Sequence, residues 1–221
     1  MDNLLQEIAL CIERGKVNQA SPFPPDMKDE EGADELTKKA IGEGISANEI
    51  LNDALMVGMR KIGDKFEEGK AFIPDMLIAA KAMNAAMVHL KPFFDSGDVV
   101  LKGDFIIGTV SGDLHDIGKN IVRMVLTGSG WNVIDLGSDV KSDTFVETLQ
   151  KFPNAVIGMS ALLTTTMMQM EVITKAIKEV SPTTMVFVGG APLSQEYSDK
   201  IGADGYFPDP NKFAKYLAQI G

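Results

Sequence analysis

FIIGTVSGDLHDIGKN, residues 105–120, joins a short β-branched run to a loop that carries acidic residues, a histidine and glycines. Similar runs recur downstream as WNVIDL (131–136), AVIGM (155–159), TMVFV (184–188) and, more weakly, GYF (205–207). Helices are expected near residues 117–128, 142–151, 166–180, 194–201 and 211–220. Strands that alternate with helices predict an α/β domain with a parallel sheet covered on both faces. Five such units favour a flavodoxin-like (Rossmann-like) strand order, with its switch point between the first and third strands.

The N-terminal part of the chain has a different pattern, which is typical of helices. Apolar residues recur at helical spacing near the start, as Leu4, Leu5, Ile8, Cys11 and Ile12. Ser46 and Glu49 have the spacing of a capping box, and Pro92 is expected to end the last helix. We therefore predict a four-helix bundle at 1–92, a linker at 93–103 and the sheet domain at 104–221.

Composition and charge limit the binding partners and the cellular compartment that we expect. A net charge of −10 disfavours binding to nucleic acid or to an anionic membrane surface. Cys11 is the single cysteine, so we expect no internal disulfide, a buried thiol and a cytoplasmic protein. The chain starts without a basic segment followed by an apolar run, so we expect no signal peptide. The uncharged stretch between Lys151 and Glu171 is rich in threonine and favours a buried strand and turn over a membrane span.

Three loops of the predicted sheet should share one edge, because ligands of such folds bind beyond the carboxyl ends of the strands. They read SGDLHDIGKN (111–120), SALLTTT (160–166) and GGAPL (189–193). The carboxylates in the first loop repel phosphate, which argues against FMN or a nucleotide. The loop carries two carboxylates, Asp113 and Asp116. A metal-bound histidine commonly donates its second ring N–H to a carboxylate, and the acid two residues before His115, Asp113, could accept it. From spacing alone, an ordinary loop histidine is the more common explanation.

The remaining residues of these loops leave two interpretations open. A zinc site is disfavoured because the other histidine, His89, and the lone cysteine fall in the helical half. One histidine can still hold a metal whose other ligands come from a macrocycle. The hydroxyl side chains of the 160–166 loop predict either a helix cap or a neutral ligand channel. Gly189 and Gly190 predict either a strand-to-helix turn or a close approach of a ligand to the backbone.

The segment GDLHDIGKNIV (112–122) closely resembles the D-x-H-x-x-G motif of corrinoid-binding proteins. That family includes cobalamin-dependent methionine synthase and the small corrinoid proteins of anaerobic methyl transfer. Its S-x-L motif resembles Ser160–Leu162, and its G-G motif resembles Gly189–Gly190. KFEEGKAFIPDM (65–76) is similar to the family's helical cap segment, and ADELTKKA (33–40) to the small-protein branch.

The resemblance implies a role for each candidate residue. His115 would be the lower axial ligand of the cobalt, Asp113 would hydrogen-bond His115, and Thr166 would stand where methionine synthase extends this relay with a serine. Phe66 and Ile73 would cover the methyl face of the corrin. The other implied cofactor contacts are Asp116, Gly118, Ser160, Leu162, Thr164, Gly189 and Gly190.

The function that the resemblance implies is that of a non-catalytic methyl carrier. The cofactor would be a cobalt corrinoid, methylcobalamin or a related cobamide. Its partners would be a substrate-specific corrinoid methyltransferase, a second methyltransferase acting on a folate or thiol, and a reductive activator protein. The helical half would be a mobile cap, with the linker as its hinge. Methylamines, quaternary amines, methanol and aryl methyl ethers are all open as methyl donors.

Three rival classes share parts of the pattern. The cobalamin-binding subunit of an adenosylcobalamin mutase has the same loop motifs, but the N-terminal bundle favours the methyl branch. A cobalamin-based sensor would require an appended DNA-binding domain, for which this length leaves no room. A receiver domain requires an aspartate after the third strand, where Met159 and Ser160 stand instead.

Overall fold

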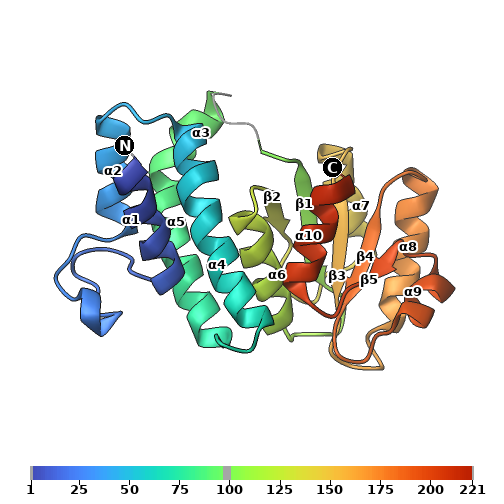
Figure 1. The fold of residues 1–221 in the computed structure, drawn as a ribbon. Helices are drawn as coiled ribbons and strands as arrows, with labels where there is room; N and C mark the ends of the chain where they lie inside the picture. Colours follow the sequence, from blue (N-terminus) through green and yellow to red (C-terminus); the bar gives the residue numbers. More distant parts are fainter. Residues whose placement is uncertain (1, 97–100, 221) are drawn as a thin grey trace. The chain divides into compact units, whose positions relative to one another are not determined.

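The computed structural model describes residues 2–96 and 101–220 (Figure 1). The chain forms two compact units. One contains Met1–Leu101 with Thr127–Gly130, and the other contains Lys102–Leu126 with Trp131–Gly221. Residues 97–100 of the predicted linker lie outside the described residues.

The N-terminal unit is the predicted helical bundle. Its elements are α1 (Asp2–Arg14), η1 (Pro25–Met27), α2 (Ala33–Gly42), α3 (Ala47–Glu49), η2 (Ile50–Leu55), α4 (Met56–Glu67) and α5 (Ile73–Asp95). The segments α3, η2 and α4 follow one another directly and form the third long helix. The predicted capping box starts it: Ser46 Oγ accepts from Glu49 N (3.2 Å), and Glu49 Oε2 accepts from Ser46 N (3.1 Å).

Two features of these helices differ from the sequence-based expectation. The segment η2 is π-helical, which no residue pattern indicated. The expected end of the last helix at Pro92 is wrong, because α5 continues to Asp95. A proline removes only its own N–H from the helix, and Ser96 N still donates to Pro92 O (3.1 Å). One missing hydrogen bond so close to the end of a long helix is tolerated.

The core of the helical unit contains the single thiol. Cys11 lies on α1 among buried apolar residues and is itself 1% exposed. This burial raises the pKa of the Cys11 thiol to about 12, although Lys16 acts in the opposite direction. The thiolate is therefore almost absent at neutral pH.

We expect Cys11 to react with a disulfide reagent such as DTNB at pH 8 about 1,000-fold more slowly than an exposed thiol, because the thiolate is the reacting species. The measurement is the absorbance of the released thiol, with and without denaturant. Cys11→Ala combined with Leu10→Cys is the matched control, since Leu10 is 43% exposed on the same helix. Fast reaction of native wild-type protein would contradict the described core.

The second unit is the predicted α/β domain. Its elements are β1 (Asp104–Thr109), α6 (Ile117–Gly128), β2 (Asn132–Asp135), α7 (Ser142–Lys151), β3 (Val156–Ser160), α8 (Met168–Val180), β4 (Val186–Gly189), α9 (Gln195–Ile201), β5 (Gly205–Tyr206) and α10 (Pro210–Ile220). All strand pairs are parallel, in the order β2-β1-β3-β4-β5, which confirms the flavodoxin-like prediction.

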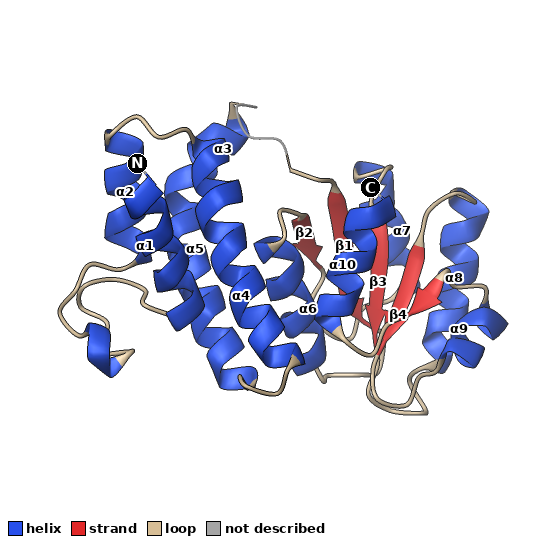
Figure 2. Cartoon of the chain, viewed as in Figure 1, coloured by secondary structure: helices blue, strands red, loops and turns tan. Residues whose placement is uncertain are grey.

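Helices cover both faces of this sheet (Figure 2). Ile106 and Ile157 face a core formed with Phe145 of α7 and residues of α8. On the opposite face, the rings of Phe105 and Phe187 meet Phe213 of α10 at centroid distances of 5.6 Å and 5.1 Å. Within the described residues, no helix is long and apolar enough to cross a membrane.

The strand register brings the three predicted loops together. Thr109 at the end of β1 pairs with Ser160 at the end of β3, and Ser160 pairs with Gly189 at the end of β4. The three strands therefore end at the same level, next to the switch point between β1 and β3. The loops that follow them share one edge of the sheet, as expected.

Candidate functional site

His115 lies on the loop between β1 and α6 and presents one ring nitrogen outward. Its Nδ1 is 2.8 Å from Asp113 Oδ1, and its backbone N–H donates to the same oxygen (3.0 Å). The imidazole is 53% exposed, whereas the Asp113 side chain is fully buried. In the part of the chain that the structure describes, Nε2 of His115 has no hydrogen-bond partner.

The second oxygen of Asp113 is held from the 160–166 loop. Oδ2 accepts from the Thr166 hydroxyl (2.7 Å) and from Leu162 N (2.8 Å), with Leu163 N slightly farther away (3.3 Å). Thr166 therefore completes the relay that the resemblance implied. It does not cap α8, which has no side-chain cap. The Thr166 hydroxyl thus contacts the loop that carries His115, and the neutral ligand channel expected from the hydroxyl side chains of residues 160–166 stays a prediction.

The charge state of Asp113 determines which tautomer His115 adopts. Burial by itself would raise the pKa of Asp113. The hydrogen bonds from Thr166, Leu162 and His115 outweigh that effect and hold the pKa well below its usual value. An ionised carboxylate can only accept, so Nδ1 of the neutral imidazole must donate. Nε2 then carries the lone pair, which is the form that binds a metal.

A pocket of about 360 Å³ opens between the sheet and helices α6 and α10. Four of the predicted residues line it: Gly118, Ser160, Gly189 and Gly190. The rest of its wall is largely apolar and aromatic, with Phe105, Ile107, Val122, Phe187, Phe207 and Phe213 among the lining side chains. Its size and lining suit an uncharged aromatic group.

Gly190 shows why a glycine is required in the wall of this pocket. Its φ is +137°, in the region that favours glycine, and a Cβ here would lie 1.8 Å from Ala161 O. Any side chain at this position would force β4 away from the loop after β3. The turn and the pocket wall thus depend on the same missing side chain, while the close approach of a ligand to the Gly189–Gly190 backbone stays a prediction.

Other predicted contacts are not among the residues that line this pocket. Asp116 is exposed and accepts from Asn120 Nδ2 (2.9 Å) instead of facing His115. The side chains of Leu162 and Thr164 point away from the pocket, because residues 162–165 form an exposed turn before α8. The backbone N–H of Leu162 donates to Asp113 Oδ2 (2.8 Å). Phe66 and Ile73 belong to the helical unit, where Ile73 is 39% exposed.

The structure also adds residues that the sequence did not single out. The buried Thr109 hydroxyl donates to His115 O (3.1 Å) and restrains the loop from the end of β1. Lys119 is buried beside the pocket, and its Nζ lies 2.6 Å from both carboxylate oxygens of Asp135. This ion pair ties the first turn of α6 to β2. The sequence feature that could have indicated this ion pair is the lysine in the GKN segment (118–120).

These features fit a metal held inside a macrocycle. Within residues 2–96 and 101–220, no group of three metal-ligating side chains lies together, so His115 would supply a single protein ligand. The same two loops and the first residue of α6 carry exposed apolar side chains: Leu114, Leu162, Leu163 and Ile117. A flat ring resting on His115 would cover this apolar surface, which is otherwise unfavourable in water.

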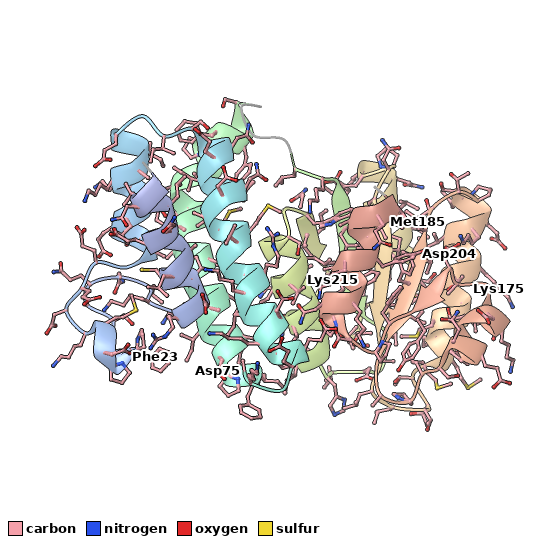
Figure 3. All side chains as sticks on the ribbon, viewed as in Figure 1. Phe23, Asp75, Lys175, Met185, Asp204 and Lys215 are labelled. Carbon is pink, nitrogen blue, oxygen red and sulfur yellow. The ribbon has the colours of Figure 1, made fainter. Side chains whose placement is uncertain are left out.

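A second hollow, of about 310 Å³, lies in the helical unit and contrasts with this site. Phe23 and Asp75, labelled in Figure 3, are among its lining residues. Its charged groups are engaged locally: Arg14 pairs with Asp26, Lys65 pairs with Glu13, and Asp75 accepts from Phe72 N. No lining group is thus left oriented toward a ligand.

Comparison with known proteins agrees with the geometry. Residues 103–212 match the model of a B12 binding domain, and residues 28–91 match a second B12 binding domain model. The chain is 42% identical over 182 residues to trimethylamine corrinoid protein 1 of Methanosarcina acetivorans, covering 80% of this chain and 84% of that protein. It is 41% identical over 174 residues to the dimethylamine corrinoid protein of Methanosarcina barkeri, covering 77% and 81%.

A solved structure extends the likeness to the fold. The methanol:cobalamin methyltransferase complex of Methanosarcina barkeri matches with a TM-score of 0.83 at 30% identity, over 99% of this chain and 80% of the matched chain. The fold and the site define a B12-binding protein. More narrowly, the chain belongs to the family of corrinoid proteins to which these methylamine relatives belong.

Proposed function

We propose that this protein carries a methyl group on the cobalt of a bound corrinoid, within a methyltransferase system. The observation that carries the proposal is His115, whose free Nε2 stands at the same sheet edge as the 360 Å³ pocket. When bound, the corrinoid supplies a cobalt ion that accepts and releases a methyl group. The protein supplies the axial ligand, the binding pocket and shielding from water.

His115 and Asp113 would set the strength of the axial bond. The Asp113 carboxylate accepts from Nδ1 and so fixes the ring orientation and the tautomer that leaves a lone pair on Nε2. Thr166 donates to the other carboxylate oxygen and keeps Asp113 ionised and in place.

The pocket would hold the nucleotide tail of the corrinoid. An aromatic base fits the ring-lined wall between β4 and α10, and Gly189 and Gly190 let it approach the backbone. The Ser160 hydroxyl is available to a polar atom of the tail. The residues that line the pocket do not require the base of the tail to carry a charge.

The partners of this carrier follow from the same proposal. One methyltransferase loads the cobalt from a methylated substrate, with methylamines as the class named for the relatives. A second would pass the methyl group to a folate or a thiol, and a reductive activator would restore oxidised cobalt. We place the system in the cytoplasm, where a lone cysteine is common.

The direct test is reconstitution with hydroxocobalamin. We expect about one corrinoid per chain after desalting, because one histidine and one pocket share the sheet edge. The measurement is the absorption spectrum of the desalted protein against its concentration. Protein that retains no corrinoid would refute the proposal.

Phe66 and Ile73 would shield the methyl face of the corrin. Replacing both by alanine should leave His115 ligation intact and speed the oxidation of cobalt(I) by oxygen several-fold, because water and oxygen then reach the metal. The measurement is the decay of the cobalt(I) absorbance band after an oxygen pulse. Leu10→Ala with Val88→Ala, which also removes exposed apolar side chains from the helical unit, is the control. Equal decay in both double variants would place the shield elsewhere.

A further inference from the structure

Asp139 is an exposed residue in the segment between β2 and α7 with an unusual backbone conformation. Its φ is +57°, in the left-handed region that residues other than glycine seldom adopt. Aspartate is one of the few side chains that tolerate this region, because it can hydrogen-bond locally. Strained positions of this kind persist where the surrounding contacts require them.

Three hydrogen bonds join Asp139 to the start of the loop that carries His115. Oδ1 of Asp139 accepts from Gly112 N (2.7 Å) and lies 3.2 Å from Ser111 Oγ, which donates to it. The backbone N–H of Asp139 donates to Asp113 O (3.0 Å). One residue thus binds three consecutive residues of the β1–α6 loop.

Main-chain hydrogen bonds of neighbouring residues add to these contacts. Thr109 N donates to Gly137 O (2.9 Å), and Val140 N donates to Thr109 O (2.9 Å). The segment 137–140 therefore lies along residues 109–113 and extends the pairing beyond the ends of the strands. Asp139 is the only member of this segment that adds a side-chain contact to the loop among the described residues.

The charge of the Asp139 carboxylate suits its role as a hydrogen-bond acceptor. The hydrogen bond from Gly112, followed by that from Ser111, lowers the pKa of its carboxyl group. The side chain is therefore ionised at neutral pH, and hydrogen bonds to an ionised acceptor are stronger than neutral ones.

Asp139 acts at a different place from the relay of Asp113 and Thr166. It touches neither the imidazole nor the Asp113 carboxylate; it holds the main chain of Asp113 from the opposite side. Asp113 is thus fixed twice, through its carboxylate by the 160–166 loop and through its carbonyl by Asp139.

We propose that Asp139 is a positioning residue that holds the His115 loop in the conformation that binds cobalt. The inference rests on the proposed corrinoid function. A purely structural role, capping the turn before α7, would stabilise the fold without changing the axial bond. The two roles differ in whether the cobalt–histidine signature responds to the mutation.

The test uses Asp139→Gly and Asp139→Asn in the full chain. Glycine adopts the left-handed backbone conformation and lacks the carboxylate. It therefore removes the side-chain hydrogen bonds to the loop without adding backbone strain. Asparagine keeps an acceptor oxygen and also tolerates the conformation. Asp29→Gly is the matched control, because Asp29 has a φ of +65° in the helical unit.

Two measurements report on the loop. The first is the dissociation constant of aquocobinamide, a corrinoid without the nucleotide tail, whose binding depends strongly on His115. The second is the share of the cobalt(II) protein that shows nitrogen superhyperfine splitting in electron paramagnetic resonance. We expect Asp139→Gly to weaken cobinamide binding about tenfold and to lower that share, as loss of an outer contact to a ligand loop does. Asp139→Asn should stay within about twofold of wild type, and Asp29→Gly should match wild type.

Wild-type ligation and affinity in Asp139→Gly would overturn the proposal. So would an equal defect in Asp139→Asn, since the loss would then not follow the acceptor oxygen. Thermal unfolding of each variant without corrinoid shows whether a lost signal reflects an unfolded protein. Failure of wild-type protein to bind any corrinoid would instead refute the proposed function, and that outcome is visible before any variant is made.

Discussion

Replacing His115 by alanine is expected to remove the protein nitrogen from the cobalt while the fold survives. The imidazole is largely exposed and on a loop, so its loss opens no core cavity. Corrinoid affinity should fall at least about 10–100-fold, the range found when even an outer contact of a metal ligand is lost. The measurement is electron paramagnetic resonance of the cobalt(II) form, in which nitrogen superhyperfine splitting from the protein should disappear.

The chain provides its own control for this experiment. His89 is the other histidine; it lies on α5 in the helical unit and pairs with Asp34. His89→Ala should keep the splitting and the affinity of wild-type protein. Splitting that persists in His115→Ala and vanishes in His89→Ala would reverse the assignment of the axial ligand.

Filling the pocket from Gly118 is expected to have the second large effect. Gly118 lines the pocket in the first turn of α6, and a Cβ there would meet no atom within 4 Å. A side chain can therefore start from this position without a clash at its Cβ, and we expect the ring of a phenylalanine here to occupy part of the pocket. Excluding an aromatic base that would bury on the order of 100 Å² costs about 2.5 kcal/mol, which corresponds to nearly a hundredfold in affinity.

The measurement for Gly118→Phe is the dissociation constant of cobalamin beside that of tail-less cobinamide. Cobalamin binding should weaken strongly, while cobinamide binding should change by no more than about threefold. Gly42→Phe is the control, because Gly42 is also helical with open space around its Cβ. An equal loss for both corrinoids would mean that the new side chain disturbs the His115 loop and not a tail pocket.

The sequence by itself determined the elements and their order. The short β-branched runs became β1, β3 and β4, and the weak GYF run became β5. Local signals were sufficient here because strand propensity and helical periodicity act over a few residues. The rule that parallel strands end at one edge also placed His115, Ser160 and Gly189 together, and the register confirmed it.

Only the tertiary structure decided how those loops hold one another. The partners of Asp113 lie 49 and 53 residues away in sequence, at Leu162 N and Thr166 Oγ1, and no local pattern predicts such bonds. The contact of Asp139 with Gly112 and the ion pair of Lys119 with Asp135 likewise join separate segments. The outward orientation of Leu162 and Thr164 depends on the turn before α8. Long-range contacts follow from strand register and loop packing, and these exist only once the sheet has formed.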